Sequence, residues 1–114
     1  MEKCLFCKIA EHEIKSDIVY EDNQIIAFKD INPQAPVHIL IIPKKHIKSI
    51  NDITESDIPV LGNIIKISAK IANEFGCAKT GFRLVVNTGH DAGQAVDHLH
   101  FHFLSGRKFI WPPG

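Results

Sequence analysis

An alternation of imidazole and apolar side chains over His98-Leu99-His100-Phe101-His102-Phe103 restricts the fold of this chain more than any other feature. A period of two residues is that of a β-strand, whose successive side chains point to opposite faces of the sheet. The pattern predicts a strand over 98–104 with its apolar residues in the core. The three histidines then share the other face, where they can line a functional site.

Four further strands are expected from runs of β-branched and aromatic residues. Ile18–Tyr20 and Ile25–Phe28 flank the polar segment 21–24 and predict a hairpin. The segment 37–42 is apolar enough for a largely buried strand, which Pro43 should end. A strand at 82–87 then leads through the glycine-bearing loop 88–97 into the histidine-rich run.

One long helix is predicted between the third and fourth strands. Its start is expected near Thr54–Asp57, where a capping residue and acidic side chains suit the free N–H groups of a first turn. Gly76 should end it in the left-handed conformation, and a short helix is expected over 5–12. The apolar stripe of the long helix, at spacings of three and four, comprises Leu61, Ile64, Ile65, Ser68, Ala72 and Phe75.

This order of elements predicts an α+β fold, with a five-stranded, mainly antiparallel sheet, one long helix and one short helix. The 114 residues suffice for one hydrophobic core but not for two ordinary domains. We therefore expect a single domain over 1–114.

The amino-acid composition limits the binding partners and the cellular compartment that can be expected. Thirteen lysine and arginine residues balance thirteen aspartate and glutamate residues, so no global field attracts nucleic acid or an anionic membrane. The longest apolar stretch, 37–42, is far short of the ~20 residues that span a bilayer. Three cysteines, an odd number, favour reduced thiols over a disulfide framework. We expect a soluble cytoplasmic protein with no nucleic-acid or membrane partner.

The histidine cluster indicates phosphate chemistry. Neutral imidazole can attack phosphorus, and a second, protonated imidazole can donate to the phosphate oxygens or the leaving group. Histidine can fill both roles near neutral pH. Two other interpretations stay open, a solvated face of an edge strand and a metal site, because His-x-His on a strand can chelate zinc.

The cysteines and the C-terminal tail are two further features of the sequence. Cys4-x-x-Cys7 has the spacing of half a tetrahedral zinc site, and the alternative is a pair of thiols on a short helix. Cys77 is expected to be a small buried apolar residue. The tail 109–114 is apolar and stiffened by prolines, so it should dock on its own subunit or on a neighbouring one.

The run 98–104 matches the His-φ-His-φ-His-φ-φ signature, with φ apolar, of the histidine triad (HIT) nucleotide-binding proteins. The sequence resembles the HINT branch of that family over nearly the whole chain. The supporting segments are Phe28-Lys29-Asp30-Ile31, Ala35-Pro36-Val37-His38, Ile42-Pro43-Lys44-Lys45-His46, Val85-Val86-Asn87, Ala92-Gly93-Gln94, Gly106-Arg107 and Trp111-Pro112-Pro113-Gly114.

The resemblance implies a hydrolase of purine nucleoside phosphoramidates or similar nucleoside monophosphate derivatives. His100 would be the nucleophile and would form a nucleotidyl-histidine intermediate. His102 would contact the phosphate, His98 with His38 would orient the nucleophile, and Asp30 would bind both ribose hydroxyls. The remaining implied contacts are a purine slot of Leu5, Phe6, Phe28 and Ile31, and a phosphate-side loop with Asn87, Gly93, Gln94 and Ala95.

The resemblance also implies a structural zinc ion and a homodimer. The zinc ligands would be Cys4, Cys7, His46 and His98. In the dimer the sheets would join across the interface, and Trp111 would approach the neighbouring subunit's site. No magnesium motif is evident, so hydrolysis should proceed in the presence of a chelator.

Two loop residues stand outside the family pattern. The HINT branch usually carries a serine where this chain has Ala95, so the resemblance does not carry over the family's rate and leaving-group preference. His90 has no family role and is expected to be solvated.

Two other functions remain possible on this sequence. One is a nucleotide-binding regulatory or partner-binding protein in which slow hydrolysis is incidental. The other is a metal-dependent hydrolase with the triad as ligands, whose turnover EDTA would abolish.

Overall fold

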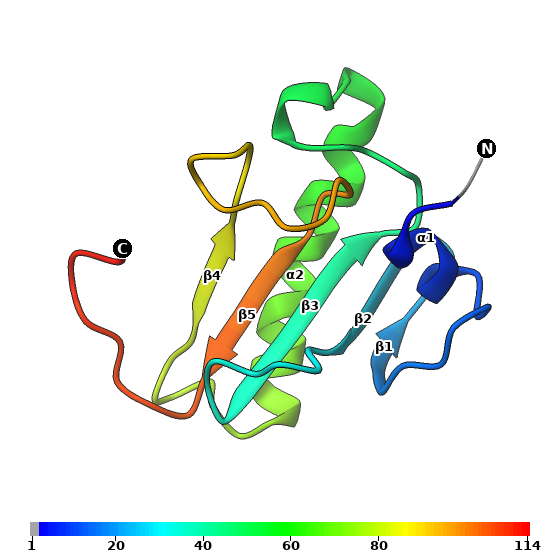
Figure 1. Cartoon of the computed structure of the whole chain (residues 1–114). Coiled ribbons are helices and arrows are strands. Elements are labelled where there is room, and N and C mark those ends of the chain that lie inside the picture. The colour runs from blue at the N-terminus through cyan, green and yellow to red at the C-terminus, as the bar shows by residue number, and fades with distance from the viewer. Residues whose placement is uncertain (1–2) are drawn as a thin grey trace.

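The computed structural model describes residues 3–114 and has the predicted α+β architecture (Figure 1). Its elements in chain order are α1 (Leu5–Ala10), β1 (Ile18–Glu21), β2 (Ile25–Lys29), β3 (Val37–Pro43), α2 (Ile58–Glu74), β4 (Arg83–Val86) and β5 (Phe101–Ser105). The strands form one five-stranded sheet in the order β1-β2-β3-β5-β4, and every neighbouring pair is antiparallel. No helix within 3–114 has the length and apolar character needed to cross a membrane.

Both faces of the central strands are covered, which explains why β3 is apolar at almost every position. Ile39 and Ile41 belong to the core cluster that α2 completes on one face. Leu40 and Ile42 belong to the cluster that α1 completes on the opposite face. Because side chains alternate along a strand, a strand buried on both faces has no polar period. The sheet is therefore a middle layer between the long helix and the short one (Figure 1).

The long helix begins later than predicted. Residues Glu55–Asp57 wind as a 3-10 turn, and α2 starts at Ile58 with Pro59 in its first turn. The buried Asp57 carboxylate accepts hydrogen bonds from the Thr54 backbone N–H at 3.0 Å and from the Lys45 ammonium at 2.8 Å. Gly76 has a φ of +72°, which confirms the left-handed helix end.

The predicted apolar stripe of α2 is partly wrong. Ile65 is 51% exposed, whereas Ile67 and Ile71, which the stripe omitted, are buried together with Ile64, Ser68 and Ala72. Residues at these spacings span a contiguous arc on a helix with 3.6 residues per turn. Ile65 lies at the rim of that arc, where a large side chain reaches solvent.

The strand predicted over 98–104 begins only at Phe101. Its pairing with β3 starts at Ile41 opposite Phe101, close to Pro43, which has no N–H to offer a partner. The chain ahead of β5 instead bonds outside the sheet, where the Leu99 N–H donates to the Ile47 carbonyl at 2.7 Å. Leu99 and Phe103 are nevertheless fully buried, as the alternation predicts.

The bend that follows β5 requires glycine at position 106. Gly106 has a φ of +96°, and a Cβ there would lie 2.8 Å from Cβ of Pro36. We expect Gly106→Ala to lower the free energy of unfolding by about 2–4 kcal/mol, because left-handed strain adds to the clash with a rigid ring.

Urea denaturation measures this loss, with Gly62→Ala as the matched control. Gly62 lies in α2, and a Cβ there meets nothing within 4 Å. That variant should gain about 0.5–1 kcal/mol, because alanine has the higher helix propensity. Equal unfolding midpoints for the two variants would show that the Gly106 bend adapts without cost.

Candidate active site

A cavity of about 340 Å³ is lined on one side by residues of α1 and on the other by sheet residues that include His102. One part of its wall is apolar and another holds the imidazoles of His100 and His102 with the carboxylate of Asp30. Its size is in the range of small-molecule sites. The lining residues are Leu5, Phe6, Ile9, Ile14, Lys15, Ser16, Phe28, Lys29, Asp30, Ile31, Leu40, Ala95, Val96, His100 and His102.

Hydrogen bonds determine which nitrogen of His100 carries the lone pair. Its Nδ1 lies 2.7 Å from the carbonyl oxygen of His98, and a carbonyl can only accept. Nδ1 must therefore hold the proton. Neutral His100 then has its lone pair on Nε2, on a side chain that is 5% exposed and lines the cavity. This is the tautomer that an imidazole nucleophile requires.

A second chain of bonds determines the tautomers of His38 and His102. The Gln34 backbone N–H donates to Nδ1 of His38 at 3.0 Å, so the proton of neutral His38 is on Nε2. That Nε2 lies 2.9 Å from Nδ1 of His102 and 3.4 Å from a carboxylate oxygen of Asp30. His38 therefore donates to His102, which leaves the Nε2–H of His102 as a donor for a ligand.

Burial keeps these imidazoles neutral. It lowers the pKa of His102 to about 4, and the neighbouring His100 and His38 act in the same direction. Burial also lowers the pKa of His38, against the opposing effect of the Asp30 carboxylate. His102 thus presents a neutral ring to the cavity until an anionic ligand enters.

The depressed pKa of His102 predicts a pH-dependent stability. Unfolded His102 binds a proton below about 6.5 and the folded form only below about 4, so stability falls as the pH drops through this window. A tenfold change in proton affinity is about 1.4 kcal/mol, and partial exposure reduces the total, so we expect a loss of roughly 2–3 kcal/mol.

Urea denaturation at pH 7 and at pH 4.5 tests this expectation, with His102→Asn as the comparison. Asparagine can still accept the proton of His38 but does not titrate in this range. The variant should lose less stability on acidification than the unmodified protein. Parallel pH profiles for the two proteins would show that His102 does not contribute.

The apolar wall is organised around Phe6. Its ring meets the ring of His100 edge-on at 5.1 Å and that of Phe28 at 5.6 Å between centroids. Leu5 is about half exposed and Ile31 is 99% exposed, so both lie at the rim of the cavity and not in its depth. The structure thus brings the residues of the predicted purine slot together, as a slot with an open edge.

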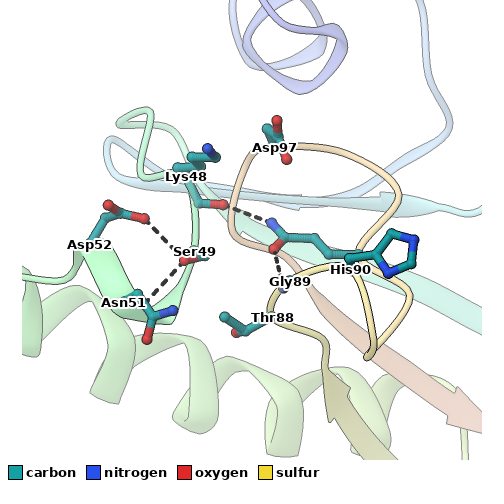
Figure 2. Close-up of a pocket in the computed structure, with 9 residues that line it drawn as sticks. Lys48, Ser49, Asn51, Asp52, Thr88, Gly89, His90 and Asp97 are labelled. Carbon is teal, nitrogen blue, oxygen red and sulfur yellow. Dashed lines mark hydrogen bonds between the residues drawn. The ribbon is translucent and has the colours of Figure 1, made fainter.

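The predicted phosphate-side loop is only partly at this cavity. Ala95 lines it, but Asn87, Gly93 and Gln94 do not. The Gln94 amide braces the loop, accepting from the Gly89 N–H at 3.0 Å and donating to the Lys48 carbonyl at 2.8 Å. It faces a separate polar cavity of about 520 Å³ (Figure 2), lined by Lys48, Ser49, Asn51, Asp52, Thr88, Gly89, His90, Gln94 and Asp97.

Other predicted features lie away from the cavity. The His90 side chain is fully solvated, as expected, and Cys77 is buried, as expected. Trp111 does not line the cavity of its own subunit and is 81% exposed. Its tail is anchored by Phe109, whose ring lies 5.1 Å from the Arg83 guanidinium and 4.3 Å from that of Arg107.

Sequence reasoning missed several residues of the site. Ile14, Lys15 and Ser16 line the cavity although they follow α1 without any periodic pattern. The Gln34 N–H and the Pro43 carbonyl orient imidazoles through the backbone, which leaves no trace in residue type. Ile9 and Leu40 did have a signal, Ile9 on the apolar face of the short helix and Leu40 in the apolar run 37–42.

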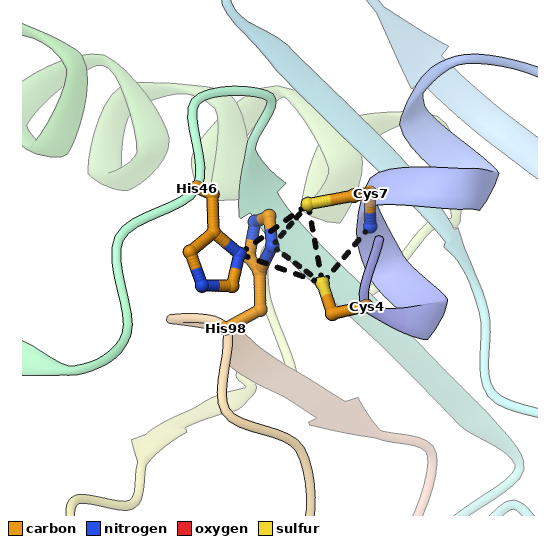
Figure 3. Close-up of side chains that lie close together, drawn as sticks. All are labelled: Cys4, Cys7, His46 and His98. Atoms are coloured by element: carbon orange, nitrogen blue, oxygen red, sulfur yellow. Dashed lines mark hydrogen bonds between the residues drawn. The ribbon is translucent and has the colours of Figure 1, made fainter. Parts of the chain in front are cut away.

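A second cluster joins the start of α1 to two histidines (Figure 3). The sulfur atoms of Cys4 and Cys7 lie 3.3–3.6 Å from Nδ1 of His46 and of His98. A tetrahedral ion with zinc's usual bond lengths to sulfur and nitrogen has S···N edges of roughly 3.6 Å. The side chains of these four residues therefore fit a zinc ion.

The protonation of His98 agrees with a ligand role. Its Nε2 lies 2.8 Å from the carbonyl oxygen of Pro43, so Nε2–H donates and Nδ1 turns its lone pair toward the two sulfur atoms. Burial and the hydrogen bond to Cys4 raise the pKa of Cys7 to about 11. Without a cation, Cys7 would hold a neutral thiol beside the two imidazoles.

Comparisons with known proteins agree with this geometry. The family model described as "Scavenger mRNA decapping enzyme C-term binding" matches residues 3–109. A purine nucleoside phosphoramidase of Escherichia coli K12 is 49% identical over 106 residues, which are 93% of this chain and 89% of that protein.

Solved structures give the same result. The HIT family hydrolase from Legionella pneumophila Philadelphia 1 superposes with a TM-score of 0.96 at 52% identity, covering 98% of this chain and all of the other. A histidine triad protein from Clostridium difficile gives 0.92 at 49%, covering 96% and 97%. Since the family model and these relatives extend over nearly the whole chain, it belongs to the histidine triad (HIT) family.

Proposed function

We propose that this protein hydrolyses purine nucleoside phosphoramidates, or similar nucleoside monophosphate derivatives, through a nucleotidyl-His100 intermediate. The observation that carries the proposal is the bond from His100 Nδ1 to the His98 carbonyl, because it leaves Nε2 unprotonated on a side chain that lines the cavity. The purine nucleoside phosphoramidase relative at 49% identity supports the same substrate class.

The cavity wall suits the three parts of a nucleotide. The purine would lie in the apolar part against Phe6 and Phe28, with Leu5 and Ile31 at its open edge. The ribose hydroxyls would donate to Asp30, whose carboxylate can accept two such bonds. The phosphate would then reach His100 and His102, and the backbone N–H of Ala95 remains near it.

Two displacements at phosphorus account for hydrolysis. In the first, Nε2 of His100 bonds to phosphorus while the phosphorus–nitrogen bond to the leaving amine breaks. The anionic phosphate raises the pKa of His102 on binding, so this ring takes up a proton from solvent and gives a proton from Nε2 to the departing amine. In the second, water attacks phosphorus, frees His100 and returns a proton to His102. Because His38, held by the Gln34 N–H, engages Nδ1 of His102, Nε2 of His102 is the atom left to exchange this proton.

The metal cluster would be structural. Cys4, Cys7, His46 and His98 would complete a tetrahedral shell with four protein donors, which leaves no position for a reacting water. The ion would hold His98 beside the nucleophile, and hydrolysis would need neither it as a Lewis acid nor magnesium. Turnover that persists in EDTA, while circular dichroism shows the fold intact, would exclude a metal-dependent hydrolase.

A homodimer would complete the site. Ile110 and Trp111 are 78% and 81% exposed, and β4 is an edge strand of the sheet. Large exposed apolar side chains beside an unpaired edge are typical of an interface. Trp111 would thereby approach the cavity of the second subunit. A cytoplasmic location fits the reduced state that the thiol cluster needs.

Mass spectrometry of protein quenched during turnover of adenosine phosphoramidate tests the proposal. An adenylyl group should be found on His100. Turnover without an adduct on any histidine would indicate attack by an activated water. A nucleotide-binding regulatory protein would instead keep its nucleotide-dependent effect on a partner after His100→Ala has removed turnover.

A further inference from the structure

The first helix belongs to two sites at once. Cys4 caps α1 and Cys7 lies within it, and both contribute sulfur atoms to the metal cluster. Leu5 and Phe6, between them in sequence, line the nucleotide cavity. Because α1 has only six residues, its metal ligands and its cavity residues cannot move independently.

His98 makes a second connection between the two sites. Its ring is fully buried between the sulfur atoms and the Pro43 carbonyl, which it meets at 2.8 Å. Its own carbonyl oxygen accepts the proton of the nucleophile, from Nδ1 of His100 at 2.7 Å. A shift of His98 away from the cluster would therefore change the orientation of His100.

The ring of Phe6 fills the space between these connections. It meets the ring of His98 edge-on at 6.0 Å and that of His100 at 5.1 Å between centroids. Side chains in direct contact transmit displacement to one another, so a shift of either imidazole reaches the Phe6 ring. The metal cluster, Phe6 and the nucleophile thus form one continuous contact path.

We infer that Cys4 and Cys7, when they bind a metal ion, position α1 and thereby the residues that hold the nucleotide. Metal in the cluster and a purine nucleoside monophosphate in the cavity then raise each other's affinity. The inference rests on the proposed function for the identity of both ligands. Thermodynamic linkage requires the two effects to be equal, and such linkages are typically about 5–150-fold.

Two titrations measure the linkage. The first determines Zn²⁺ affinity by competition with a chromophoric chelator, with and without saturating AMP. The second determines AMP affinity by calorimetry on zinc-loaded and zinc-depleted protein, with circular dichroism to show that the depleted protein is folded. We expect both factors to agree and to be at least about fivefold.

The variant Phe6→Leu distinguishes metal–nucleotide linkage from metal binding alone. It keeps all four metal ligands but removes the aromatic ring that lies between the two sites. Its Zn²⁺ affinity without nucleotide should stay within about twofold, while the linkage factor falls toward one. Cys77→Ala is the matched control, since this buried cysteine lies outside the cluster and should leave the linkage intact.

If removal of zinc unfolds the chain, the linkage can be measured on metal-loaded protein instead. Co²⁺ occupies the same kind of tetrahedral site, and its visible bands respond to ligand geometry. Adding AMP to cobalt-loaded protein should shift these bands, and the shift should shrink in Phe6→Leu.

Each outcome decides a different question. Folded protein that binds both ligands with unchanged affinities and unshifted bands would overturn the linkage alone. Failure to bind AMP would overturn the proposed nucleotide function as well. Failure to bind Zn²⁺ or Co²⁺ would overturn the metal assignment and the linkage with it, while leaving nucleotide chemistry at His100 standing.

Discussion

Replacing His100 by alanine is expected to lower kcat for adenosine phosphoramidate hydrolysis by at least about 10⁴-fold. The variant loses the only imidazole that the bond to the His98 carbonyl prepares with an unprotonated Nε2 at the cavity. The remaining donors can bind and polarise the phosphate but cannot form the covalent intermediate. AMP affinity should change much less, because the apolar wall and Asp30 are untouched. Steady-state kinetics and calorimetry on the same preparation measure both quantities.

His90→Ala is the matched control for this experiment. His90 is fully solvated in the loop that follows β4, and it does not line the cavity of His100. Its removal should leave kcat and KM within about twofold, as for a surface substitution away from the site. A His100→Ala protein that keeps more than a tenth of the normal kcat would rule out His100 as the nucleophile.

The fold was predictable wherever one local rule determined the outcome. The continuous apolar run of β3 and the alternation around β5 place the centre of the sheet, because the first is typical of a strand buried on both faces and the second has the two-residue period of a strand. Gly76 ends the helix as expected. The errors lie where tertiary contacts override local preference: β5 starts late because the chain beside Pro43 leaves the sheet, and α2 starts late because residues 55–57 wind more tightly.

The site was predictable in its residue types but not in its protonation. Alternation alone places His98 and His100 near each other, yet it assigns them the same environment. In the structure they serve different sites, because His98 turns Nδ1 to the thiols and His100 presents Nε2 to the cavity. The difference comes from two backbone carbonyls, those of Pro43 and His98, whose positions depend on the whole fold.

Removing one cluster ligand is expected to have the largest effect on stability. Cys7→Ala should reduce bound zinc from about one ion per chain to almost none and lower the free energy of unfolding by at least about 3 kcal/mol. Structural zinc contributes folding energy directly, and here it would tie three distant segments together, α1, the turn with His46 and the approach to β5 with His98. Metal analysis and urea denaturation measure the two effects.

Cys77→Ala provides the comparison, because Cys77 is equally a free cysteine but lies in the α2 core and not in the cluster. It should keep its zinc and lose only about 1 kcal/mol, the cost of a small core truncation. If Cys7→Ala were no less stable than Cys77→Ala, the cluster would not stabilise the fold. The short helix would then have to be held on the sheet by Phe6, Ile9 and Ala10 alone, whose apolar contacts with β2 and β3 form the smaller of the two cores.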